Sequence, residues 1–193
     1  MARRYRSILD HLGHAVGGED IEVLDGFSEA DADAFIVATP TESHAEILHS
    51  LKDCGRPILC EKPISKSLTQ LETLLGDLKR VGTRIQMVSQ YDYLIDEGFD
   101  GQTEYDYFKS GSDGLYWDCI NIIKHARGTV SLACESPVWN CMINGQKLNL
   151  GLMDKAYVEM IDHWLRDPTR TDYDGIFKTH KKVHDLEARC HKS

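Results

Sequence analysis

Two short segments combine side chains that could do chemistry with residues that force the chain to turn. One is Thr39-Pro40 and the other is Glu61-Lys62-Pro63, and each follows an apolar run of strand length. Buried parallel strands show such runs, and ligands of parallel sheets bind at the carboxyl ends of the strands. A lysine held there could present its cation to a ribose hydroxyl, or donate to a carbonyl or alkoxide oxygen. A lysine that stood alone would more often be a surface residue in a loop.

Predicted helices and strands alternate through the first 90 residues. Apolar residues recur at helical spacing up to Leu12, where Gly13 follows as a C-cap, and again over 41–54 and 68–81. A Thr or Ser is expected to cap the second helix, and Ser67 and Gln70 stand in capping-box spacing before the third. The predicted strands cover 14–20, 34–38, 56–60 and 84–89. This alternation predicts an α/β fold, a Rossmann-like doubly wound parallel sheet, as a nucleotide-binding domain over 1–90.

The second half has a different pattern. Residues 91–114 are rich in Tyr, Asp and Gly and are expected to be irregular, whereas 115–125 is predicted to be helical. Strands at 129–134 and 139–150 flank Asn144-Gly145, a strong hairpin signal. Two amphipathic helices, over 153–165 and 173–190, complete a predicted small α+β lobe for substrate binding or dimerisation over 91–193.

Composition excludes several classes of protein. The 193 residues carry a formal net charge of −9, with 41% hydrophobic and 27% charged residues, which is typical of a globular chain. No apolar run approaches the ~20 residues of a membrane helix, and no apolar signal core follows the N-terminus, so a cytoplasmic protein is expected. The acidic balance disfavours nucleic acid as a partner. Six cysteines without a CxxC pair favour reduced thiols over disulfides, and no metal site is expected.

The succession of a strand, a Thr-Pro turn, a helix, a strand and Glu-Lys-Pro resembles the Gfo/Idh/MocA oxidoreductases. The resemblance implies that Lys62 lies beside the nicotinamide and the substrate, and that Thr39 and Pro40 line the cofactor. Glu61, in the same turn as the lysine, is assigned to the cofactor site with them. His44 also fits the family pattern, but its place in the first turn of a helix favours capping or packing over catalysis.

The glycine-rich phosphate turn of that family is absent from the sequence. The resemblance places Ala2 at the third small residue of the turn, so that the first strand and both leading glycines are missing. We hypothesise that Met1 is internal to a longer reading frame, or that the natural protein is shortened. Asp20 lies roughly 18 residues after Ala2, where a ribose-binding carboxylate is expected, which favours NAD over NADP. An ordinary acidic turn at Asp20 remains the alternative.

The family's third motif, Asp-x-x-x-His, is matched only in part. Asp118 fits its first position, but Ile122 stands where the histidine is expected. His125 lies on the same face of the predicted helix, about one turn further on, and could transfer a proton near neutral pH. The alternative roles are capping of the helix end by His125 and a surface ion pair for Asp118.

The sequence is compatible with two functions, one enzymatic and one non-catalytic. The first is an NAD- or NADP-dependent oxidoreductase that acts on a sugar or polyol-like alcohol, with Lys62, Asp118 and His125 as its catalytic residues. The second is a non-catalytic relative that binds a nucleotide or a sugar, or acts through protein contacts. The intact turns favour the first, whereas the absent glycines and Ile122 favour the second. The sequence leaves a homo-oligomer open in either case.

Overall fold

The computed structural model describes residues 1–17, 32–93, 120–125, 128–135, 138–143, 146–147 and 150–190, although side chains in parts of the later segments are not described. Two compact units divide the chain. The first contains Met1–Ser89 together with Val158–Lys181, and the second contains Gln90–Tyr157 together with Lys182–Ser193. The candidate turns lie in the first unit.

The first unit is built on a parallel sheet of three short strands, β1 (Phe35–Val37), β2 (Ile58–Cys60) and β3 (Ile85–Met87). Their order is β1-β2-β3, and β2 pairs in parallel with both neighbours. All three residues of β2 are buried because its apolar side chains face packed elements on both sides of the sheet. The predicted α/β architecture with a parallel sheet is confirmed.

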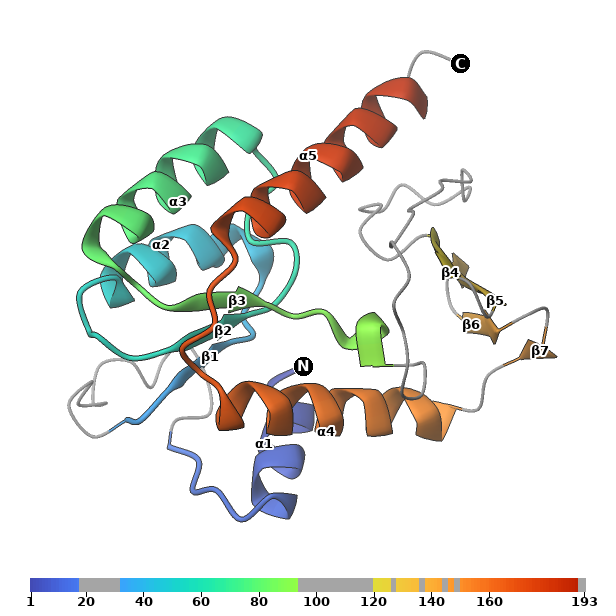
Figure 1. Cartoon of the computed structure of the whole chain (residues 1–193), viewed down its shortest axis with the longest axis horizontal. Coiled ribbons are helices and arrows are strands. Elements are labelled where there is room, and N and C mark those ends of the chain that lie inside the picture. The colour runs from blue at the N-terminus through green and yellow to red at the C-terminus, as the bar shows by residue number, and fades with distance from the viewer. Residues whose placement is uncertain are drawn as a thin grey trace. The chain divides into compact units, whose positions relative to one another are not determined.

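Helices complete this unit. Helix α2 (Thr41–Leu51) connects β1 to β2 and α3 (Leu68–Val81) connects β2 to β3, and Figure 1 shows both on one face of the sheet. Figure 1 draws α1 (Ala2–His11) on the opposite face, together with the part of α4 (Leu150–Arg166) that belongs to this unit, from Val158 onward. The first residues of α5 (Tyr173–Cys190) join the core between the sheet, α2 and α3. Its buried members are Val37, Leu48, Leu51, Ile58, Cys60, Ile64, Leu71, Leu74, Leu75, Leu78, Ile85 and Ile176.

Three of the predicted helix ends are confirmed and one is corrected. The Ser67 hydroxyl accepts a hydrogen bond from the Gln70 N–H and caps α3, and Gly82 ends that helix with a left-handed φ of 76°. Gly13 follows α1 in the same conformation. The N-cap of α2, however, is Pro40, and no side chain caps that helix. Because proline fixes φ, the Thr-Pro turn itself directs the chain into α2.

The second unit contains an antiparallel sheet in the order β4-β5-β6-β7, formed by Ile120–His125, Gly128–Glu135, Val138–Ile143 and Gln146–Lys147. The predicted hairpin is confirmed, since Ile143 pairs with Gln146, although the two turn residues lie outside the described part of the chain. The prediction of a helix over 115–125 is wrong for 120–125. Three isoleucines make this segment a good strand, and it pairs along its whole length with β5.

Three other predictions concern segments that are described only in part or that end earlier than expected. Residues 14–17 have irregular backbone, and the rest of the predicted strand at 14–20 lies outside the described ranges. Helix α4 begins at Leu150, so the predicted strand does not extend to that residue. A short 3-10 helix, η3, covers Gln90–Tyr93 at the start of the predicted irregular connection.

Within the described ranges, no helix is long and apolar enough to span a membrane. No group of three or more His, Cys, Asp or Glu side chains in those ranges is arranged to hold a metal ion. The two cysteines whose side chains are described, Cys54 and Cys60, are free thiols, and burial raises the pKa of Cys60 well above its ordinary value.

Candidate functional site

The two chemically informative turns leave the sheet side by side. Val37 pairs with Cys60, and the Glu61 N–H then donates to the Val37 carbonyl oxygen over 2.8 Å. The parallel ladder therefore continues one residue beyond the strands before the two turns begin. The turns accordingly share the carboxyl edge of the sheet, where parallel α/β folds bind their ligands.

The buried carboxylate of Glu61 fixes the Glu-Lys-Pro turn to helix α1. Glu61 is only 7% exposed, and the Tyr5 hydroxyl of α1 donates to its Oε1 over 2.5 Å. The Lys62 N–H donates to the other oxygen, Oε2, over 3.2 Å. Both oxygens of the carboxylate thus have partners, as burial of a carboxylate requires. The Lys62 side chain itself is partly exposed at this edge.

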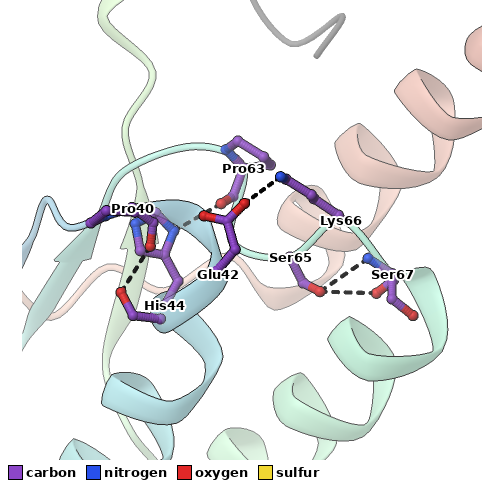
Figure 2. A network of polar contacts seen from close by, with 8 residues as sticks. Pro40, Glu42, His44, Pro63, Ser65, Lys66 and Ser67 are labelled. Carbon is purple, nitrogen blue, oxygen red and sulfur yellow. Dashed lines mark hydrogen bonds and ion pairs between the residues drawn. The ribbon is translucent and has the colours of Figure 1, made fainter. Parts of the chain in front are cut away.

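His44, in the first turn of α2, lies between the two turns and is 1% exposed. Its Nδ1 is 2.9 Å from the Pro63 carbonyl oxygen and its Nε2 is 2.7 Å from the Thr39 carbonyl oxygen. Figure 2 shows the imidazole ring in this position, with Pro40 and Pro63 near it. The sequence favoured capping or packing for this residue, and the structure places its ring against both turns.

The hydroxyl groups of Thr39 and Ser43 form a chain of hydrogen bonds that ends at the Pro40 carbonyl. The Ser43 oxygen lies 2.8 Å from the Pro40 carbonyl oxygen and 2.8 Å from the Thr39 hydroxyl oxygen. A carbonyl can only accept, so the single Ser43 proton goes to Pro40 and the Thr39 hydroxyl donates to Ser43. The Thr39 oxygen therefore keeps lone pairs with which it can accept from a ligand.

The segment after Pro63 is fixed by α5. The Ile64 N–H donates to Nε2 of His180 over 3.0 Å, and Nδ1 of the same ring donates to the Ile176 carbonyl oxygen over 2.8 Å. This pattern fixes the neutral tautomer. Burial lowers the pKa of His180 from its ordinary 6.5 to about 4, although the hydrogen bond to Ile176 opposes the shift.

An ion pair joins the same segment to α2 at the surface. Lys66 contacts the carboxylate of Glu42, as Figure 2 shows, and this hydrogen bond lowers the pKa of Glu42. The side chains are 46% and 67% exposed, so solvent screens the pair and its contribution to stability is small. The firm links between the turns and the helices are therefore the buried ones, made by Tyr5, His44 and His180.

The remaining predicted site residues are not brought to this edge by any described contact. Ala2 is exposed at the first position of α1. Asp20 and Asp118 lie outside the described residues. His125 is the last residue of β4 and pairs with Gly128, and nothing is described of its side chain. Because 120–125 is a strand, the helical spacing that related Asp118 to His125 does not apply.

Sequence reasoning did not assign two of the residues that hold the turns. Tyr5 belongs to the helical repeat of α1, and no local pattern marks it as the partner of a turn. His180 lies in an amphipathic helix and 116 residues from its partner Ile64, and no local pattern relates the two. The local sequence shows His180 only as a histidine within the amphipathic pattern of that helix.

Comparison with known proteins gives a family match for the segment that carries both turns. Residues 11–89 match the GFO_IDH_MocA family model, described as an oxidoreductase family with an NAD-binding Rossmann fold. An inositol 2-dehydrogenase from Rhodococcus jostii is 34% identical over 89 residues, which are 41% of this chain and 24% of that protein. A glucose-6-phosphate 3-dehydrogenase from Bacillus subtilis is 34% identical over 80 residues, 40% of this chain and 22% of that protein.

Solved structures align over a similar fraction of the chain. A putative myo-inositol dehydrogenase from Sinorhizobium meliloti is 24% identical, with a TM-score of 0.36, and the match covers 46% of this chain and 26% of the other. The matched segment thus spans about a quarter of the length of the curated relatives.

Proposed function

We propose, because residues 11–89 match the Gfo/Idh/MocA oxidoreductase family model, that this chain takes part in hydride transfer between a nicotinamide cofactor and a sugar or polyol-like alcohol. The observation that carries the proposal is the placement of the Thr-Pro and Glu-Lys-Pro turns at one edge of a parallel sheet. Lys62 stands in the second turn, and buried contacts fix the residues on either side of it.

The residues of this edge suit a dinucleotide chemically. The Lys62 ammonium offers donors to a ribose or substrate oxygen, and the Thr39 oxygen can accept from a hydroxyl or carboxamide.

In the proposed reaction the protein acts mainly on the oxygen of the alcohol. A bound nicotinamide would supply the acceptor for the hydride that leaves the carbon. Lys62 donates a hydrogen bond to the alcohol oxygen and stabilises the negative charge that develops on it. The hydroxyl proton must leave to a base. Among the two cofactors we favour NAD, with Asp20 accepting from the adenosine ribose.

Cofactor binding tests the first part of the proposal. The full chain is titrated with NADH and NADPH, and binding is followed by energy transfer from its three tryptophans to the reduced nicotinamide. We expect saturable binding, tighter for NADH than for NADPH. Absence of saturation with either cofactor at millimolar concentration would overturn the oxidoreductase assignment for this polypeptide.

Turnover tests the assignment of Lys62. NAD reduction is measured with myo-inositol and with glucose 6-phosphate, the compounds in the names of the two curated relatives. Lys62→Met should lower kcat by about 100-fold, which is the usual effect of losing one donor to a developing oxyanion. Lys66→Met is the matched control, since it removes the same charge from an exposed position four residues away. Equal losses in both variants would remove Lys62 from the reaction.

A non-catalytic role is the second candidate, and it rests on Ile122. The family pattern expects a histidine at this position, and the chain instead has an isoleucine within strand β4. Saturable NADH binding without turnover of any polyol, and with no effect of Lys62→Met beyond affinity, would support a cofactor-binding protein instead of an enzyme.

A further inference from the structure

We infer that His44 is a positioning residue that fastens the Thr-Pro turn to the Glu-Lys-Pro turn and so fixes the spacing of the two walls of the cofactor site. This inference rests on the proposed function for its consequence, but the connection between the turns stands on geometry alone. The ring is 1% exposed, and its two nitrogens contact backbone oxygens of Thr39 and Pro63, one from each turn.

The contacts of the ring differ from those of a helix cap or an apolar packing residue. A cap would satisfy the free N–H groups at the start of α2, whereas both partners of His44 are carbonyl oxygens outside the helix. An apolar side chain could fill the same space, but it would offer no donor to either carbonyl oxygen. A neutral ring donates to one of them, and a protonated ring donates to both.

The other links between the two turns are weaker or lie elsewhere. The Glu61 N–H bond to the Val37 carbonyl joins the strands beneath the turns, not the turns themselves. The ion pair of Glu42 with Lys66 joins α2 to the later residues of the loop, but it is exposed and screened. Among the described contacts, His44 is therefore the buried side chain that reaches both turns.

The position of the ring also explains how it acts on Lys62. Pro63 follows the lysine directly, and its carbonyl is held by His44, while the carboxylate of Glu61 accepts from the Lys62 N–H. The backbone of the lysine is thus fixed on both sides. Without the imidazole, the Glu61 side remains tied to α1, whereas the Pro63 side loses its link to Thr39 and the two turns can separate.

The test compares His44→Leu with Thr83→Val in the full chain. Thr83 is 3% exposed, and its hydroxyl donates to the Lys52 carbonyl just beyond the other end of α2. Both variants therefore remove buried side-chain hydrogen bonds that hold α2, but only His44 contacts the candidate turns. Urea unfolding measures the stability of each variant, NADH and NADPH titrations measure affinity, and amide hydrogen exchange measures local opening.

We expect His44→Leu to raise the NADH dissociation constant by about tenfold, in line with the loss of one buried hydrogen bond, and Thr83→Val to leave it within about threefold. Exchange of the Glu61 and Ser43 amides, which donate to Val37 and Pro40, should accelerate by about tenfold in His44→Leu only. His44→Gln, which keeps one donor, is measured in parallel and should give intermediate values, so that a folding failure of the leucine variant does not end the test.

Two results separate the inference from the proposed function. If the wild-type chain binds neither NADH nor NADPH, the proposed function fails, and hydrogen exchange alone then decides whether His44 joins the turns. If His44→Leu and His44→Gln retain wild-type exchange at Glu61 and Ser43, the inference is overturned whatever the cofactor affinity is. Equal loss of affinity in the His44 and Thr83 variants would also overturn it, because the effect would then follow the stability of α2.

Discussion

Acidification should destabilise the first unit through His180, the buried histidine of α5. Its Nε2 accepts from the Ile64 N–H, and burial lowers its pKa from 6.5 to about 4. The unfolded chain therefore takes up a proton on this residue as the pH falls below about 6.5, whereas the folded chain does so only below about 4. The stability associated with the neutral ring is complete above pH 6.5 and is lost progressively between these two values.

The size of the effect follows from the separation of the two pKa values, 6.5 − 4 = 2.5. One pKa unit corresponds to about 1.4 kcal/mol. The unfolding free energy should therefore fall by about 3 kcal/mol in total once the pH is below both pKa values. At pH 5 the loss should amount to about 2 kcal/mol, a large share of the stability of a small domain. The physical cause is burial, which disfavours the charged ring, and a protonated Nε2 would also point a donor at the Ile64 N–H, which is itself a donor.

Urea unfolding of the wild type and of His180→Gln at pH 7.5, 6 and 5 measures this loss. A glutamine does not titrate, and its amide oxygen can accept from Ile64 while its nitrogen donates to Ile176. All other groups titrate alike in both proteins, so the difference in unfolding free energy isolates His180. We expect the advantage of the wild type to fall by about 2 kcal/mol between pH 7.5 and 5. A difference that does not change with pH would refute the reasoning.

Three further predictions concern local contacts of the first unit. Tyr5→Phe keeps the ring but removes the donor to Glu61, and it should lower the unfolding free energy in urea by about 2 kcal/mol. Ser67→Ala removes the cap that accepts from Gln70, and a loss of about 1 kcal/mol is expected, with Ser67→Asp as the variant that restores it. Gly82→Ala meets no neighbouring atom within 4 Å, so its expected cost of about 1 kcal/mol comes from the left-handed φ of 76° alone. An unchanged unfolding free energy in any one of these variants would contradict the reason given for that variant.

The fold of the first unit was largely predictable because its signals are local. Apolar runs, Pro40, Ser67 and Gly82 mark where strands and helices begin and end, and short connections restrict the strands to a parallel order. Segment 120–125 was not predictable in the same way. Its isoleucines fit either a helix or a strand at that length, and pairing with β5 decides between them.

In the candidate site, too, local signals predict the turns but not the contacts that hold them. The sequence by itself determined that Thr39-Pro40 and Glu61-Lys62-Pro63 end neighbouring strands, because both motifs directly follow the runs that form β1 and β2. Only the tertiary structure decided what holds these turns in place. Tyr5, His44 and His180 reach them across 56, 19 and 116 residues of chain, and no local pattern encodes contacts of that separation. They form because burial leaves the polar groups of the turns without water, so that each must find its partner in whichever helix packs against it.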